Sequence, residues 1–225
     1  MKYKDTVEKL AKEYHLEEKL KDLFPIIESF DKRNELFTIL NNDVKTANNA
    51  AKLQPADQYL RRTVIRTTFA MIEGLLNILN QAVLDYYKGG FAQLTPDEIE
   101  DLTEEKRKKN GELTANFMRT SKKITFSFNL FAQKIGGFSY SIDTTTNEWT
   151  QFEKAIRIRN RITHPRNLED MILNEEEMSS ILDVAKWFVT LYIDLENRIG
   201  NALSKKNSIE SLIQARIKGI QSGKK

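Results

Sequence analysis

A run of positive charges around one histidine is the most chemically distinctive part of this sequence. Residues 154–168 read Lys-Ala-Ile-Arg-Ile-Arg-Asn-Arg-Ile-Thr-His-Pro-Arg-Asn-Leu, with five fixed positive charges, one histidine and no acid. The whole chain has 35 basic and 32 acidic residues and a formal net charge of +3, so the overall composition does not explain this excess. The run is therefore the part of the chain in which to look for chemistry on a polyanion.

The side chains in this run suit cleavage of RNA without a metal ion. Such cleavage needs a base for the 2′-hydroxyl proton, an acid for the leaving 5′-oxygen, and cations for the charge that builds on the phosphate. Histidine ordinarily changes charge near neutral pH, so His164 is the candidate acid or base. Arg159 is the candidate for stabilising the transition state, and Asn160 is expected to position the phosphate or the histidine.

Other kinds of catalytic site find little support in the sequence. The chain has no cysteine and only two histidines, so a zinc site would need the distant His15 and His164 together with carboxylates. No GxGxxG or GxxxxGK[ST] segment occurs, and the glycine pairs at 89–90 and 136–137 are interpreted as helix ends. We predict no metal and no cofactor, and we assign His15 no function.

The candidate residues need a helix that ends beside the histidine. On a helix, Asn160 and His164 are four residues apart and share a face, whereas Arg159 lies about 140° from His164. Pro165 disfavours helix at the residue before it, and the helix end can relax that angle. We therefore expect the site to form at a helix C-terminus.

Hydrophobic spacing predicts helices along most of the chain, and hence an all-α fold. The clearest helix covers 59–87, where a buried seam repeats at spacings of four and three: Ile65, Phe69, Ile72, Leu76, Leu79 and Val83. An exposed stretch is expected at 104–111 and a loop packed by aromatic side chains at 138–142. Further helices are expected over 5–23, over 26–50, from Thr95-Pro96, over 113–135, from a capping box at Thr145-x-x-Glu148 to near His164, and over 175–203.

A polar stripe on the 59–87 helix is the second group of candidate residues. Arg62, Arg66, Glu73, Asn77 and Asn80 lie about 100° around the helix from the apolar seam. One interpretation is an ordinary solvated face. In the other, Arg66, Glu73 and Asn77 border the cationic run and either orient Arg159 or contact phosphate.

The run resembles the Arg-x(4 to 6)-His motif of the HEPN superfamily, in which a polar residue commonly follows the arginine. Arg159-Asn160 and His164 match it, and Arg-Asn-Arg-Ile-Thr-His-Pro is close to the wording in many bacterial members. Residues 66–77 also resemble the long first core helix of several such families. The resemblance covers roughly residues 56–203.

The resemblance implies a HEPN-type helical bundle that dimerises with two motifs facing each other, forming one composite ribonuclease site. Such proteins often act as toxins of toxin-antitoxin systems or in phage defence, so a partner protein is expected as well. Members controlled by AMP-transferring antitoxins often carry a tyrosine two residues after the histidine. This chain has Arg166 there, which excludes that form of regulation.

The chemistry independently favours a homodimer. A single motif offers one histidine, whereas 2′-hydroxyl attack is best served by two proton-transfer groups on opposite sides of the phosphate. A two-fold contact would supply both from one sequence, although about ten like charges would then face each other. The expected RNA-binding residues are Arg157, Arg161, Arg166, Arg66, Glu73 and Asn77.

The sequence also predicts the domain boundaries and the cellular location. The chain divides into an N-terminal helical extension (1–55), the bundle (56–203) and a basic tail (204–225). Absence of cysteine, a charged N-terminus and the lack of a long apolar stretch predict a cytoplasmic protein without a membrane segment.

The alternative to an endoribonuclease leaving 2′,3′-cyclic phosphate ends is a non-catalytic HEPN module for dimerisation, scaffolding or nucleotide sensing.

Overall fold

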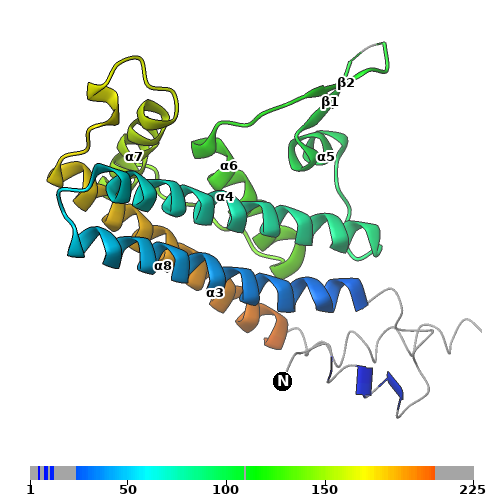
Figure 1. Ribbon diagram of the computed structural model, residues 1–225. Helices are drawn as coiled ribbons and strands as arrows, with labels where there is room; N and C mark the ends of the chain where they lie inside the picture. The colour runs from blue at the N-terminus through cyan, green and yellow to red at the C-terminus, as the bar shows by residue number, and fades with distance from the viewer. Residues whose placement is uncertain (1–4, 6–7, 10, 13–23, 109, 206–225) are drawn as a thin grey trace, which may run out of the picture.

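The computed structural model describes residues 5, 8–9, 11–12, 24–108 and 110–205, and it has the all-α fold that the sequence predicts. Three long helices lie side by side: α3 (Phe24–Leu53), α4 (Gln58–Lys88) and α8 (Glu175–Lys205) (Figure 1). The shorter α6 (Thr120–Phe131) and α7 (Asn147–Thr163) also pack on α4. None of the described helices is long and apolar enough to cross a membrane.

α4 is the central helix of the bundle. All six residues of its predicted seam are buried, which confirms the helix and its inward face. The Asp57 carboxylate caps its first turn by accepting hydrogen bonds from the backbone N–H groups of Tyr59 and Leu60. The helix ends at the predicted glycine pair, where Gly90 has a φ of 75°. Its burial on several sides leaves only a narrow stripe of α4 for solvent.

α3 belongs to the same hydrophobic core as the rest of the bundle. Val44, Ala47 and Ala51 of α3 join the core formed by α4, α6, α7 and α8. The side chain of Arg33 is buried, and its Nε donates to Glu196 of α8 at 3.1 Å. The predicted boundary near residue 55 is thus a turn between two packed helices. Most of the predicted 5–23 helix, and the tail beyond residue 205, lie outside the described residues.

The segment between α4 and α6 differs in part from its prediction. The predicted cap of α5 (Pro96–Thr103) is present, with reciprocal hydrogen bonds between Thr95 and Glu98. The helix predicted from Leu113 is wrong over its first residues. β1 (Glu105–Arg107) and β2 (Leu113–Ala115) instead form an antiparallel hairpin, with Lys106 opposite Thr114, that projects from the body in Figure 1. The hairpin turn contains Gly111, whose φ of 85° suits glycine, and this local turn competes with helix.

α6 and α7 bring the remaining candidate residues into the bundle. α6 continues into a π-helical turn at Ala132–Gly136, and the predicted aromatic loop follows, with Tyr140 buried against Phe128. The capping box predicted at Thr145 is wrong, although α7 does begin within one residue of the predicted start. Thr146 caps α7 by accepting from the N–H of Trp149, whereas the Thr145 hydroxyl donates to Asp143. Because Trp149 stands three residues after Thr146, the cap is a single side-chain hydrogen bond and not the reciprocal capping box, and the backbone of Thr146 has the extended conformation of an N-cap.

Candidate functional site

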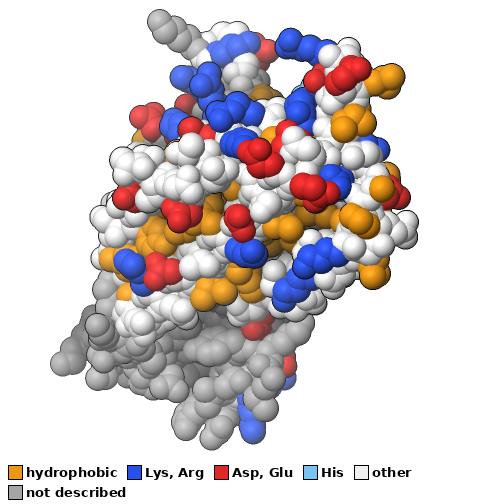
Figure 2. Space-filling view, turned by 90° about the vertical axis from the view of Figure 1, so that its left-hand side faces the viewer, with side chains coloured by type: hydrophobic (Ala, Val, Ile, Leu, Met, Phe, Trp, Pro, Cys, Tyr) orange, Lys and Arg blue, Asp and Glu red, His pale blue; other side chains and the backbone are white. Residues whose placement is uncertain are grey.

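The cationic run occupies the second half of α7 and the loop after it. Ile158 and Ile162 are buried and fix this part of the helix against the bundle. Arg157 and Asn160 are exposed, and Arg159 is partly exposed. The helix ends at Thr163, as Pro165 requires, and His164 is its C-terminal cap. Figure 2 shows the end of the molecule that contains α7, where Lys and Arg side chains in the upper part are interspersed with Asp and Glu.

Arg159 is joined to Glu73 of α4. Its Nη2 donates to Glu73 Oε1 at 2.8 Å, and its guanidinium lies 5.9 Å from the centre of the Phe69 ring. Its Nη1 also donates to the side-chain oxygen of Asn160 at 3.2 Å. The side chains of Arg159 and Glu73 are 31% and 40% exposed, so the pair contributes little stability but fixes the direction of the guanidinium. The cation remains accessible to a phosphate.

His164 is exposed immediately after the last helical residue. Its backbone N–H donates to the carbonyl of Asn160 at 3.0 Å, and its φ of −127° and ψ of 62° depart from helix. Within the described part of the chain, its imidazole forms no hydrogen bond or ion pair. The histidine is therefore accessible for proton transfer.

Polar contacts hold the far end of the 164–174 loop against α4. Gln58 binds both backbone groups of Leu173, accepting from its N–H at 2.8 Å and donating to its carbonyl at 3.1 Å. Arg62 donates to the carbonyl of Met171 at 3.0 Å. The sequence did not single out Gln58, because a helix surface glutamine carries no signal of a distant backbone partner.

Arg161 is engaged in contacts within the fold. It forms an ion pair with Glu177 at 3.1 Å and donates to the carbonyl of Ile172 at 3.1 Å. Arg157 and Arg166 are exposed, and no ion pair within the described residues involves their side chains. Of the predicted RNA-binding arginines near the histidine, these two are accordingly the more available to a ligand.

The exposed stripe of α4 differs in two residues from the predicted one. It consists of Arg66, Ala70, Glu73, Asn77 and Gln81, whereas Asn80 is only 5% exposed and Arg62 holds the loop. Asn77 accepts a hydrogen bond at 2.7 Å from Nζ of Lys123, on the first turn of α6, which also pairs with Glu104 at 2.6 Å. The sequence did not identify Lys123, because its partner on α4 is 46 residues away.

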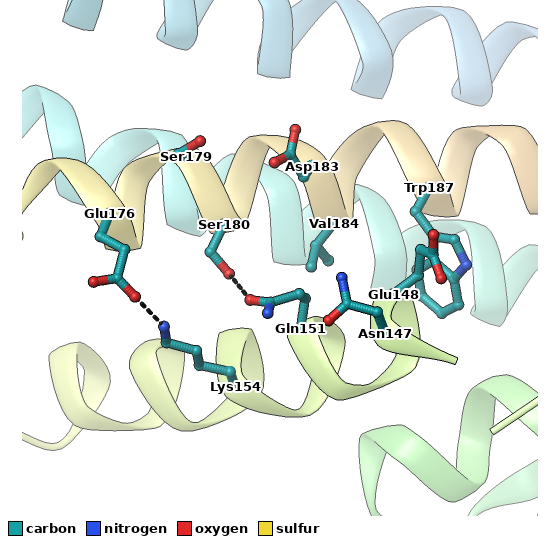
Figure 3. Close-up of a pocket in the computed structure, with 10 residues that line it drawn as sticks. All are labelled: Asn147, Glu148, Gln151, Lys154, Glu176, Ser179, Ser180, Asp183, Val184 and Trp187. Carbon is teal, nitrogen blue, oxygen red and sulfur yellow. Dashed lines mark hydrogen bonds and ion pairs between the residues drawn. The ribbon is translucent and has the colours of Figure 1, made fainter. Parts of the chain in front are cut away.

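A hollow of about 440 Å³ lies between α7 and α8, away from these residues. Figure 3 shows its two cross-links, in which Lys154 pairs with Glu176 at 2.7 Å and Ser180 donates to Gln151 at 2.9 Å. The hydrogen bond and charge of Lys154 lower the pKa of Glu176. None of Arg159, Asn160 and His164 lines this hollow.

Comparison of the chain with protein-family models, curated proteins and solved structures found no match. The functional case therefore depends on the geometry of α7, α4 and the loop that follows α7. That geometry joins Arg159, Asn160 and Glu73 in one hydrogen-bonded group and leaves His164 accessible one helical turn beyond Asn160.

Proposed function

We propose that the chain is a metal-independent endoribonuclease of the HEPN type that acts as a homodimer. The observation that carries the proposal is the ion pair between Arg159 and Glu73, which directs a partly exposed guanidinium that also donates to Asn160, on the helix that His164 caps. A directed cation and an accessible imidazole are the two kinds of group that the reaction needs.

The proposed reaction is an attack within the RNA strand. The 2′-oxygen forms a bond to phosphorus while the 2′-hydroxyl proton passes to a base. The bond from phosphorus to the 5′-oxygen breaks, and that oxygen takes a proton from an acid. His164 of the two protomers would supply base and acid, and Arg159 would stabilise the charge on the non-bridging oxygens. The products are a 2′,3′-cyclic phosphate and a 5′-hydroxyl.

The proposed setting is the cytoplasm, with phage defence or a toxin-antitoxin pair as the biological context. An endoribonuclease of this kind harms the cell that makes it unless a partner protein restrains it. We therefore propose a protein antitoxin or a defence-system component as a second partner. Expression of the chain alone should then be toxic, and the His164→Ala variant should not be.

The test is incubation of the purified chain with tRNA and mRNA in the presence of EDTA, followed by analysis of the product ends. We expect cyclic phosphate and 5′-hydroxyl ends, with His164→Ala and Arg159→Ala each lowering the rate by about 100-fold or more. His15→Ala is the matched control, since it removes the other histidine and should retain activity. Products with 3′-hydroxyl ends, or full activity of His164→Ala, would show that the mechanism is wrong.

The alternative is a non-catalytic HEPN module for dimerisation, scaffolding or nucleotide sensing. One observation favours it: Arg159 and Arg161 both already have carboxylate partners within the fold, as structural residues do. This alternative predicts that His164→Ala leaves every cellular effect intact, whereas a variant that disrupts the dimer abolishes them.

A further inference from the structure

The chain between β2 and the first turn of α6 presents an exposed aromatic ring. Phe117 is 82% exposed, which is unusual for so large an apolar side chain. Arg119 and Lys122 follow it and are exposed as well. Among the described residues, neither cation forms an ion pair. We call residues 116–123 the α6 entry segment.

Hydrogen bonds hold the entry segment at both ends. The backbone N–H of Asn116 donates to the carbonyl of Glu104 at 2.7 Å, and its side-chain amide donates to Asp101 of α5 at 3.2 Å. At the other end, Lys123 binds Asn77 and Glu104. Phe117 is thus presented by an anchored backbone, which lowers the entropic cost of using its ring for binding.

The entry segment adjoins the site through α4. Asn77, which binds Lys123, lies one helical turn from Glu73, which binds Arg159, a rise of about 6 Å along the helix. In Figure 1 the chain returns from the hairpin to the beginning of α6, which lies between α7 and the hairpin. A strand bound at Arg159 could therefore continue along the exposed stripe of α4 to Phe117.

The charge of this surface is complementary to nucleic acid. Arg66, Arg119, Arg157 and Lys122 are exposed cations, and the acids Glu73 and Glu104 are already paired with Arg159 and Lys123. An exposed ring flanked by cations is typical of single-strand binding, in which bases stack on the aromatic and phosphates contact the cations. A duplex offers no free base face to such a ring.

We propose that Phe117, Arg119 and Lys122 bind the single-stranded RNA that flanks the phosphate cleaved at Arg159 and His164. The ring of Phe117 stacks on a base, and the two cations contact phosphates. This inference rests on the proposed ribonuclease function and adds a second contact for its substrate. The cations could contact the phosphates of a duplex or of a single strand. Only a single strand can also offer a base that stacks on the ring, so a single strand is the proposed ligand.

The test measures binding of a fluorescent single-stranded RNA to the full chain, in a His164→Ala background that preserves the probe. We expect Phe117→Ala to weaken binding by about 5- to 100-fold and Phe117→Tyr to retain it. Replacing Arg119 and Lys122 with alanine should reduce the slope of log affinity against log salt by about 1.4. Tyr87→Ala and Lys45→Ala, at an exposed aromatic and an exposed lysine elsewhere, are matched controls and should bind like the background.

A second measurement separates this inference from the proposed function. With His164 present, Phe117→Ala should raise KM for cleavage and leave kcat nearly unchanged, because stacking away from the phosphate stabilises the bound and transition states equally. Unchanged RNA affinity in Phe117→Ala, with cleavage by the wild type intact, would overturn the inference alone and favour a protein ligand for the ring. Weaker binding by Phe117→Ala in a chain that never cleaves RNA would support the binding surface and reject the proposed function.

Discussion

Two arginines that lie two residues apart on α7 differ in what they are free to do. Arg161 is bound by Glu177 and by a backbone carbonyl of the following loop. Arg159 pairs with Glu73 and donates to Asn160, and it does not bind the loop; the exposed fractions of the two arginine side chains are nearly equal, 31% for Arg159 and 33% for Arg161. The difference follows from their directions on the helix, since residues two apart point about 160° from each other. We therefore propose the catalytic role for Arg159, whose side chain does not hold the following loop.

Replacing Glu73 with glutamine should impair cleavage by misdirecting Arg159. We expect kcat to fall by about 10- to 100-fold with little change in KM, because the guanidinium would no longer be held in its productive direction. The free energy of unfolding should change by less than about 1 kcal/mol, since the pair is partly exposed. Steady-state kinetics and chemical denaturation measure the two quantities.

Glu153→Gln is the matched control for that experiment. Glu153 is an exposed carboxylate on α7, and no ion pair within the described residues involves it. Its replacement should leave kcat unchanged. If Glu73→Gln and Glu153→Gln have equal kcat, Glu73 does not position Arg159.

At the scale of the elements, α4 organises the candidate site from its first two turns and from its middle. The first two turns bind the 164–174 loop through Gln58 and Arg62, and the middle binds Arg159 through Glu73. The chain before His164 and the chain after it are thus both bound to the same helix. This explains how an exposed histidine in a loop can keep a defined position.

Gln58→Ala should loosen the loop that carries His164. The substitution removes two hydrogen bonds to Leu173, which is 1% exposed: the Leu173 N–H loses its partner, whereas the carbonyl keeps its hydrogen bond from Arg61 at 2.7 Å. We expect the free energy of unfolding to fall by about 1–3 kcal/mol and the Leu173 amide to exchange its hydrogen faster. Hydrogen exchange read by mass spectrometry or NMR measures the effect. Gln81→Ala, on the exposed stripe of the same helix, should leave exchange at Leu173 unchanged, and equal exchange in the two variants would contradict the clamp.

At the scale of the whole molecule, the structure reduces the repulsion expected in a dimer of facing motifs. Glu73 and Glu177 each neutralise one arginine of the cationic run, so fewer unpaired charges would oppose each other. Large apolar side chains lie exposed in the adjacent loop, with Leu168 at 83% and Ile172 at 55%. Such side chains are suited to a contact that surrounds a cationic centre.

Mixing inactive protomers should restore activity if two copies share one site. Equal amounts of Arg159→Ala and His164→Ala chains should regain a small part of the wild-type rate, because a mixed dimer holds one His164 and one Arg159, whereas each single-variant dimer lacks one of these groups altogether. A wild-type monomer in light scattering that cleaves at full rate would refute the shared site.

Substitutions at the exposed apolar residues of the loop after α7 test whether that loop forms the dimer contact. Leu168→Glu combined with Ile172→Glu should give a monomer by light scattering and abolish cleavage. Ile39→Glu combined with Ile193→Glu, at exposed apolar residues of α3 and α8, should leave both properties unchanged. A dimer that survives the loop substitutions would place the contact elsewhere.

The sequence by itself determined the features that depend on local spacing. The α4 seam, its glycine end, the cap of α5 and the end of α7 at His164 were predictable, because helix periodicity and capping act within a few residues. The start of α7 was displaced by one residue only. The helix predicted from Leu113 failed, because strand pairing across a turn depends on a partner that periodicity does not reveal.

Only the tertiary structure decided which candidate side chains meet. Spacing placed Glu73 and Asn77 on one stripe of a helix, but their partners Arg159 and Lys123 lie 86 and 46 residues further along the chain. The structure also shows that Arg161 and Arg62 bind the loop and that Asn80 is buried. The physical reason is that helix periodicity fixes the direction of a side chain around its own axis, whereas its partner depends on how separate helices pack against one another.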